Sequence, residues 1–257
     1  MEIGKGSTGM QAELLSGPGT VPALTHFFVT ASVPCPYVAG RAERKLIVEL
    51  PEGEAAALYD GLSRGGFRRS HGFAYRPACR ACSACVPVRI AVEAFRHSRS
   101  TRRVRNLNRG LTGRLVAPRA TIEQFHLFAA YQRSRHRDSD MAAMSFADYR
   151  SMVEDSPVRT VMAEFRDAGE TLVAATLIDR LDDGFSAVYS FFDPAADRNS
   201  LGTWNILWMV EECRRLGLPY VYLGYWIGES PKMAYKARFP ALERLTRRGW
   251  VGFAEPG

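Results

Sequence analysis

Long apolar runs are missing from this sequence. The first twenty residues read MEIGKGSTGMQAELLSGPGT, without the apolar core of a secretory signal and without a segment long enough to span a bilayer. We therefore expect a cytoplasmic protein that makes no membrane contact. Residues 1–24 are rich in Gly, Ser and Pro, and we expect them to form a disordered leader.

Cysteine is also scarce, with five residues, an odd number, in a chain of 257. A chain of this length can bury a core without cross-links, so the count argues against a disulfide framework. Cys79, Cys82 and Cys85 follow C-x-x-C-x-x-C spacing, and Cys35 lies between two prolines. The four thiolates suit zinc or an iron–sulfur cluster, and they equally suit a group of reduced, redox-sensitive thiols. The sequence leaves these two interpretations open.

Catalytic histidine patterns are absent too. The five histidines show no metal-ligand spacing, and no Ser-His-Asp arrangement is evident. These absences disfavour a histidine-ligated metal centre and a serine-hydrolase triad. They fit a reaction that depends on holding two reactants together and that requires no cofactor for the transfer itself.

Acidic residues are absent from one long stretch. Residues 96–119 contain eight arginines and no Asp or Glu, in a chain whose net charge is +7. We expect this stretch to form a solvated strand-loop surface that lies along a phosphate backbone, and the alternative is a basic face that is only solvated. Arg99, Arg102, Arg103 and Arg105 are the candidate phosphate-binding residues of this stretch.

The order of elements in the second half of the chain indicates a fold class. Thr121 and Gln124 form a capping box at the start of one helix, and a second helix follows near residues 146–153. Residues 158–194 predict three strands joined by turns at DAG and DDG. A helix over residues 200–217 and a buried strand over residues 219–227 come next. This is the order of a GNAT-type acyltransferase core, so we predict an α+β fold.

One turn departs from the acetyl-CoA users of that fold. Their central helix begins with a glycine-rich turn whose backbone N–H groups bind a pyrophosphate. Here the corresponding turn reads DRNSLGTW, with Thr203 in place of a second glycine. Acetyl-CoA is therefore disfavoured, whereas another phosphate-bearing acyl carrier is not.

Four sequence blocks carry a resemblance to a known family. They are CPYVAGR (35–41), GFRRSHGFAYRPACRACSACVPVRI (66–90), YSFFDPAADRNSLGTWNIL (189–207) and YVYLGYWIGESPKMAYKARFPALE (220–243). Together they resemble the bacterial aspartate/glutamate leucyltransferases, or leucyl-tRNA–protein transferases, which are relatives of the eukaryotic arginyl-tRNA–protein transferases. The similarity runs from about residue 25 to Trp250.

The resemblance implies a function and a division of the chain. It implies transfer of leucine from leucyl-tRNA to the α-amino group of proteins that begin with Asp or Glu, which marks them for degradation by the N-degron pathway. It also implies a GNAT-like aminoacyl-transferase domain over residues 121–257. An N-terminal α/β subdomain over residues 25–120 would carry the cysteines and the basic stretch. The alternatives are an arginyl-tRNA donor, or a non-catalytic, redox-sensing tRNA-binding protein.

The implied reaction selects candidate site residues. The tRNA backbone requires the basic stretch, with Arg99, Arg102, Arg103 and Arg105 as the candidate tRNA-binding residues. An acidic acceptor requires Arg or Lys, and Arg76 and Arg89 flank the cysteine motif. The terminal adenosine and the ester require aromatic and polar groups at the end of the buried strand. The segment GYWIGESPKMAYK supplies Tyr225, Lys232, Tyr235 and Lys236 as catalytic candidates and Trp226 as a substrate-binding candidate. The alternative for Tyr225 and Trp226 is that they are core residues.

Overall fold

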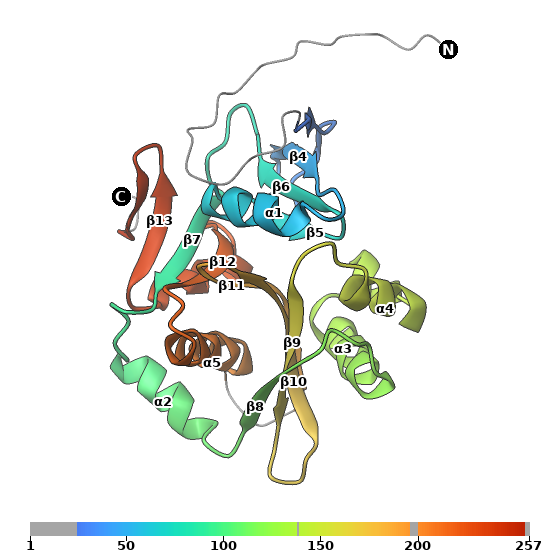
Figure 1. The fold of residues 1–257 in the computed structure, drawn as a ribbon, viewed down its shortest axis with the longest axis vertical. Coiled ribbons are helices and arrows are strands. Elements are labelled where there is room, and N and C mark those ends of the chain that lie inside the picture. Colours follow the sequence, from blue (N-terminus) through green and yellow to red (C-terminus); the bar gives the residue numbers. More distant parts are fainter. Residues whose placement is uncertain (1–24, 138, 196–199, 255–257) are drawn as a thin grey trace.

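The computed structural model describes residues 25–137, 139–195 and 200–254. Its centre is an eight-stranded sheet with the strand order β14-β13-β7-β12-β11-β10-β9-β8 (Figure 1). The strands are β7 (Val86–Ala91), β8 (Thr112–Val116), β9 (Thr160–Arg166), β10 (Leu172–Leu181), β11 (Gly184–Phe192), β12 (Tyr220–Trp226), β13 (Leu242–Thr246) and β14 (Gly249–Gly252). The predicted disordered leader, residues 1–24, lies outside the described residues.

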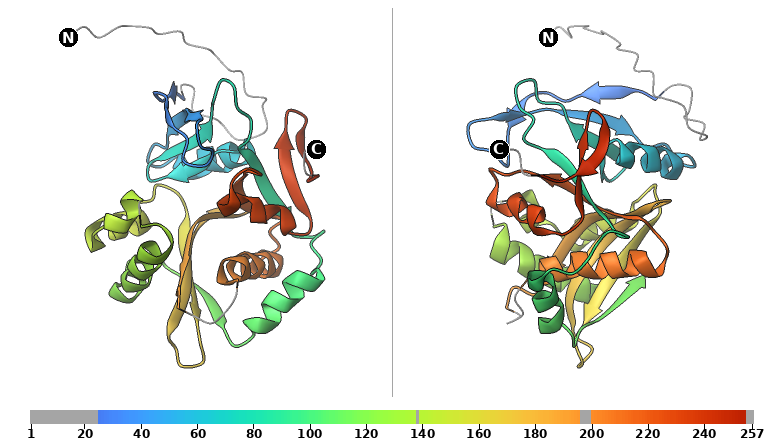
Figure 2. Two further views of the ribbon diagram at one scale, coloured as in Figure 1. Left: turned by 180° about the vertical axis from the view of Figure 1, so that it is seen from behind. Right: turned by 90° about the vertical axis from the view of Figure 1, so that its left-hand side faces the viewer.

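A smaller, four-stranded sheet with the order β1-β4-β6-β5 forms one end of the molecule together with helix α1 (Figures 1 and 2). Its strands are β1 (Phe27–Val29), β4 (Lys45–Glu49), β5 (Arg68–Ser70) and β6 (Phe73–Pro77), and α1 spans Ala55–Arg64. A two-stranded ribbon, β2 (Val33–Pro34) and β3 (Ala42–Glu43), lies between β1 and β4 in the chain. Below, this region is called the small sheet.

Helices cover both faces of the large sheet. They are α2 (Arg99–Leu107), α3 (Ile122–Arg135), α4 (Phe146–Glu154), α5 (Leu201–Arg215) and α6 (Pro231–Ala234), with 3₁₀ turns η1 (Asp140–Ala143) and η2 (Tyr235–Arg238). α5 lies against one face, and α3 and α4 lie against the other (Figure 1). Successive residues of β9 point to opposite faces, so Ala163 packs in the cluster with α5 and Met162 in the cluster with α3 and α4. No helix among the described residues is long and apolar enough to cross a membrane.

The predicted acyltransferase order is confirmed. β9, β10 and β11 form an antiparallel meander, α5 follows, and β12 returns parallel to β11. The capping box at Thr121 and Gln124 starts α3. Every residue of β12 except Tyr220 is buried, as predicted for a central strand. The fold is α+β, with a GNAT-like core.

Two strands from before residue 120 lie in the same sheet as the later ones. β7 pairs with β12 and β13, and β8 forms the far edge beside β9. The large sheet therefore continues across the boundary expected at residue 120.

The arginine-rich stretch begins with a helix, so the prediction of a strand-loop surface is wrong for its first half. α2 starts after Ser98, whose side chain accepts a hydrogen bond from the Thr101 amide at 3.3 Å. Thr101 is buried and Val104 packs against the main core, which fixes one side of the helix. Arginine is itself a good helix former. Pattern analysis missed this helix because it has few apolar residues.

A buried ion pair joins the small sheet to the large one. The Arg69 guanidinium donates two hydrogen bonds of 2.8 Å to the Asp179 carboxylate on β10, and the two side chains are 2% and 0% exposed. Asp179 also accepts a hydrogen bond from Thr160. Removing one partner of such a pair leaves a buried charge without its counterion.

We expect Arg69→Met to lower the free energy of unfolding by about 3–5 kcal/mol, because the Asp179 charge would remain buried and unpaired. Arg41→Met is the control, since the side chains of Arg41 and its partner Glu229 are 42% and 52% exposed and such a pair should contribute about 0–1 kcal/mol. Urea unfolding of the two variants measures the difference. Equal and small changes in the free energy of unfolding of both variants would contradict a stabilising role for the Arg69–Asp179 ion pair.

Candidate active site

The site begins where β11 and β12 separate. The two strands pair only at Gly184, Phe185 and Ser186 of β11. Beyond this point β11 pairs only with β10, and β12 only with β7. Both strands also contain an irregularity here, because Val188 is passed over in the pairing with β10 and Leu223 in the pairing with β7. Bulges of this kind redirect side chains and leave backbone groups unpaired. The region where these two strands stop pairing is called the cleft below.

Arg68 lies where the cleft begins. It comes from β5, donates through Nη1 to Ser186 Oγ at 3.0 Å, and donates through Nη2 to the Ala187 carbonyl. Gly224 permits this approach, because a Cβ on that residue would lie 2.9 Å from Arg68 Nε. Its φ of +72° also favours glycine. Sequence analysis did not select Arg68. Strand alternation places it opposite Arg69, but only the fold shows which of the two faces the cleft.

Lys236 on η2 is brought to the same strand. It is 7% exposed, and its Nζ donates to the Tyr225 carbonyl at 2.6 Å and approaches Met233 Sδ at 3.8 Å. Burial, assisted by the charge of Arg68, lowers the pKa of Lys236 to about 7. The prediction therefore selected a lysine that can be neutral near physiological pH, which is the condition for a general base.

Tyr225 and Trp226 have structural contacts. The Tyr225 hydroxyl donates to the carbonyls of Gly66 at 3.0 Å and Tyr75 at 3.2 Å, which links β12 to the small sheet, and burial raises its pKa. The Trp226 indole donates to the Ala234 carbonyl at 3.2 Å and packs in the core. These contacts match the alternative that both residues belong to the core, and they do not suit the predicted catalytic and substrate-binding roles.

Aromatic side chains from α3 and β11 gather near Tyr235. The Tyr131 and Phe192 rings are 4.8 Å apart, and Gln132 Nε2 donates to the Tyr189 hydroxyl at 2.7 Å. Tyr235 is half-buried, and burial together with Tyr131 raises its pKa to about 12. Sequence analysis did not select these α3 and β11 residues.

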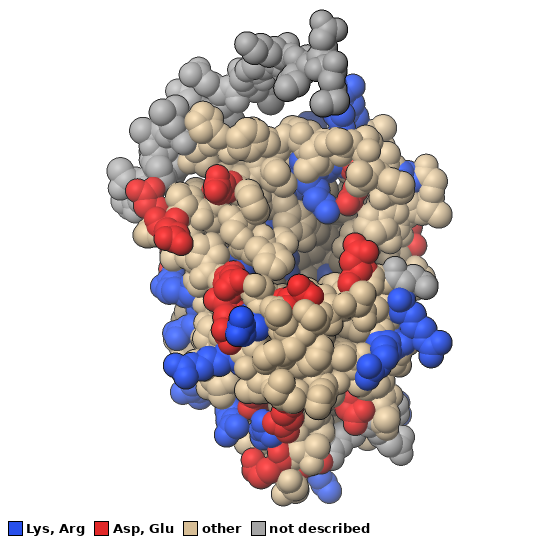
Figure 3. Space-filling model, turned by 90° about the vertical axis from the view of Figure 1, so that its right-hand side faces the viewer, with Lys and Arg blue, Asp and Glu red and all other residues tan. Residues whose placement is uncertain are grey.

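Lys232 lies at the rim of this group. It is exposed on α6. Its charge contributes to the lowered pKa of His136, after the larger effect of burial. Figure 3 shows that the side of the molecule carrying α3 and α4 is hollowed near its centre, with Lys or Arg side chains visible within the hollow.

The two predicted acceptor-binding arginines differ in their surroundings. Arg76 is exposed, donates to the Gly65 carbonyl at 3.1 Å and lies over the Phe67 ring at 5.5 Å. Arg89 is 7% exposed, and its Nε donates to Glu243 at 2.7 Å. The Arg89 guanidinium is also enclosed by the rings of Tyr220 and Trp250, at 3.4 and 4.4 Å. The geometry therefore leaves Arg76 accessible and makes Arg89 an internal ion pair that does not suit the predicted contact with an acceptor.

The four cysteines lie in one region of the molecule. Arg41 Nη1 donates to Cys82 Sγ at 3.3 Å, and Cys79 Sγ lies 3.5 Å from the Arg44 amide. Burial, together with the charges of Cys35, Cys79 and Cys82, raises the pKa of Cys85 to about 11. Within the described ranges, no three His, Cys, Asp or Glu side chains are arranged to hold a metal ion. The zinc and iron–sulfur interpretations and the redox sensitivity of the thiols all stay predictions.

The candidate tRNA-binding arginines all lie on α2. Arg99, Arg102, Arg103 and Arg105 are exposed, and in the described part of the chain none of them forms an ion pair with a carboxylate. A cavity of about 160 Å³ separates α2 from the start of α5 and from η2, and Thr101, Thr203 and Tyr235 are among its lining residues. The basic helix is therefore next to the segment that carries Lys236. Part of the altered phosphate-binding turn, residues 196–199, lies outside the described residues.

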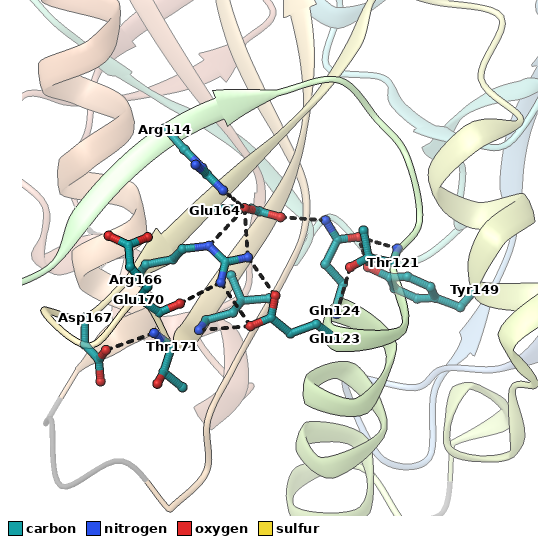
Figure 4. Close-up of polar contacts among 11 residues, drawn as sticks. Arg114, Thr121, Glu123, Gln124, Tyr149, Glu164, Arg166, Asp167, Glu170 and Thr171 are labelled. Atoms are coloured by element: carbon teal, nitrogen blue, oxygen red, sulfur yellow. Dashed lines mark hydrogen bonds and ion pairs between the residues drawn. The ribbon is translucent and has the colours of Figure 1, made fainter.

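A larger cavity of about 340 Å³ lies at the other edge of the sheet, and most of the charged side chains that line it pair with one another. Glu164, 4% exposed, accepts hydrogen bonds from Gln124 and Arg114, while Arg166 binds Glu123 (Figure 4). Tyr149 donates to Gln124, which ties α4 to the same group. This network holds α3 to β9.

The chain matches the models of two protein domains. Residues 33–103 match the arginine-tRNA-protein transferase N terminus, and residues 123–246 match the arginine-tRNA-protein transferase C terminus. The chain is 59% identical over 232 residues to the aspartate/glutamate leucyltransferase of Rhodospirillum rubrum, covering 90% of this chain and 94% of that protein. It is 58% identical over 231 residues to the protein of the same name from Paramagnetospirillum magneticum, covering 90% and 94%.

Solved structures give more distant likenesses. L-PGS from Bacillus licheniformis aligns with 70% of this chain and 54% of its own, at 13% identity and a TM-score of 0.46. A GCN5-related N-acetyltransferase from Kribbella flavida aligns with 62% and 54%, at 13% identity and a TM-score of 0.35. On the sequence matches over most of its length, the chain belongs to the arginine-tRNA-protein transferase family of aminoacyltransferases, in the group of the aspartate/glutamate leucyltransferases.

Proposed function

We propose that the cleft transfers leucine from leucyl-tRNA to the α-amino group of proteins that begin with Asp or Glu. The observation that carries this proposal is the buried Lys236, with its pKa lowered to about 7, next to the separating strands of an acyltransferase core. The names of the relatives supply the amino acid and the acceptors. We expect the reaction to take place in the cytoplasm, where the product would enter the N-degron pathway.

The donor would approach along α2. Its exposed arginines can neutralise phosphates of the acceptor stem, and a protein that does so gains affinity independent of sequence. From α2 the 3′ end would pass Tyr235 into the cleft, where the aromatic group of Tyr131, Tyr189 and Phe192 offers surfaces for the adenine base and the leucyl side chain.

The chemistry requires modest catalytic help. An α-amino group has a pKa of about 7.7–8.0, so a neutral lysine can accept its proton near pH 7. The free amine attacks the leucyl ester carbonyl, an amide bond forms, the ester C–O bond breaks, and the ribose oxygen leaves with a proton that Lys236 can return. Orientation of the two reactants can contribute up to about 7–11 kcal/mol. We expect backbone N–H groups near Val188, where the pairing of β11 with β10 is irregular, to stabilise the developing oxyanion.

An acceptor panel tests this function. With labelled leucyl-tRNA we expect transfer to peptides that begin with Asp or Glu, and little transfer to peptides that begin with Lys or Arg. Arginyl-tRNA should be a poor donor. Binding of leucyl-tRNA without any transfer would support the non-catalytic alternative, and equal transfer to a Lys peptide would contradict the proposed acceptor.

A further inference from the structure

The arginines around the cleft differ in whether they have a counterion. Three of the six on residues 64–89 pair with carboxylates: Arg64 with Asp182 and Asp183, Arg69 with Asp179, and Arg89 with Glu243. Arg68, Arg76 and Arg80 form no ion pair among the residues that the structure describes. Of these three, only Arg68 lies within the cleft, since Arg76 is exposed over Phe67 and Arg80 is exposed as well.

The charge of Arg68 is not balanced by its contacts. Its partners, the Ser186 hydroxyl and the Ala187 carbonyl, are neutral. Its charge also helps to lower the pKa of Lys236, so Lys236 supplies no counterion to Arg68. Enclosing a guanidinium without a counterion is costly, and a carboxylate that can accept two parallel N–H bonds is the ligand that best offsets this cost. The arrangement therefore provides a place for an anionic group of a ligand.

Arg68 and Lys236 are held by consecutive residues of β12. Arg68 lies against Gly224, and Lys236 donates to the carbonyl of Tyr225. In an N-terminal Asp or Glu the side-chain carboxylate and the α-amine are attached to the same short carbon chain. A carboxylate bound at Arg68 would therefore bring the amine toward Lys236, the group assigned to remove its proton.

We infer that Arg68 binds the side-chain carboxylate of the acceptor's N-terminal residue and so determines acceptor specificity. The inference rests on the proposed function. Arg68 thus takes the acceptor-binding role that was predicted for Arg89, which is paired with Glu243. Arg76 is exposed and would not contact the bound carboxylate directly. Gly224 contributes to the same binding site, because the side chain of any larger residue would push Arg68 away.

The test compares peptides that begin with Asp and with Asn, which have the same shape and differ in charge. We expect the wild-type protein to favour Asp, and Arg68→Gln to lower kcat/KM for Asp by about 100-fold, the effect of losing a hydrogen bond to a charged group worth about 2.7 kcal/mol. The kcat/KM for the Asn peptide should change by less than about threefold, since the neutral Asn amide gains little from the charge of Arg68. Arg68→Lys should restore part of the Asp preference, and Arg159→Gln, which removes an exposed guanidinium elsewhere, should leave both kcat/KM values unchanged.

Two outcomes would overturn the inference while the proposed function stands. One is an equal loss for Asp and Asn in Arg68→Gln, which would make Arg68 a structural support of the cleft. The other is loss of the Asp preference in Arg76→Gln instead. If the wild-type protein transfers leucine to neither peptide, the proposed function fails and the inference fails with it. Thermal melts of each variant show that the comparison is made on folded protein.

Discussion

Lys236→Met should lower the rate of leucyl transfer by about 10²–10⁴-fold, the usual contribution of a general base. The reason is that Lys236 is the buried lysine next to the cleft whose environment keeps it neutral near pH 7. Lys236→Arg should not restore activity, because a guanidinium stays protonated. Single-turnover rates with preformed leucyl-tRNA and an Asp peptide measure the effect without interference from product release.

The pH dependence gives this prediction a second readout. Lys236 must lose its proton to act, so its active fraction rises as the pH increases through about 7. We expect the wild-type rate to rise over this range, together with deprotonation of the acceptor at about 7.7–8.0. The Lys236→Met variant should retain only the pH dependence that comes from deprotonation of the acceptor's α-amino group. Transfer by Lys236→Met within about threefold of the wild-type rate would remove Lys236 from the mechanism.

Loss of activity should not reflect loss of folding. The pKa of Lys236 is lower in the folded chain, at about 7, than in an unfolded chain, at about 10.4. Between these values the unfolded state binds the extra proton, so stability rises with pH, and at pH 8 the native lysine still reduces stability. Lys236→Met removes this cost, and we expect its melting temperature at pH 8 to be no lower than that of the wild-type protein.

A double substitution on α2 should have the second large effect. Arg99 and Arg103 are one helical turn apart and are both exposed, so they can contact the same phosphate backbone. Replacing both with Ala should weaken tRNA binding and reduce the slope of log Kd against log salt by about 1.4–1.8, or about 0.7–0.9 for each lost contact. Filter binding at several salt concentrations measures the slope.

Arg215→Ala is the control for this experiment. Arg215 is also an exposed helical arginine, but it pairs with Glu212 on α5, so its removal should leave the slope unchanged. If the double variant keeps the wild-type slope, the tRNA path lies elsewhere on the surface. If Arg215→Ala changes the slope as much, net charge and not the position of α2 determines binding.

Much of the fold could be predicted because its signals are local. The capping box at Thr121, the turns of the meander and the apolar run of β12 each depend on neighbouring residues, and each prediction was confirmed. α2 was missed because its stability depends on packing of a few residues such as Val104 on a distant core. Lys236 could be selected because its segment combines aromatic residues and lysines in one block.

The roles of the arginines could not be predicted, because each depends on a distant partner. Arg69 and Arg68 are adjacent, yet Asp179, 110 residues after Arg69, neutralises that residue and leaves its neighbour unpaired. Arg89 looked accessible beside the cysteine motif, but Glu243, 154 residues later, encloses it in an ion pair. Which arginine binds a ligand is determined by which acidic residues the fold brings close, and strand alternation does not contain that information.

We expect the leucylated 3′ end of the tRNA to lie between the separated strands β11 and β12. Hydrogen exchange with a leucyl-adenosine analogue, in which an amide replaces the ester, tests this claim most directly. We predict slower exchange of backbone amides in residues 187–192 and in η2, and unchanged exchange in β8, which borders the cavity of about 340 Å³. Protection of β8 and the start of α3, with residues 187–192 unaffected, would contradict the account.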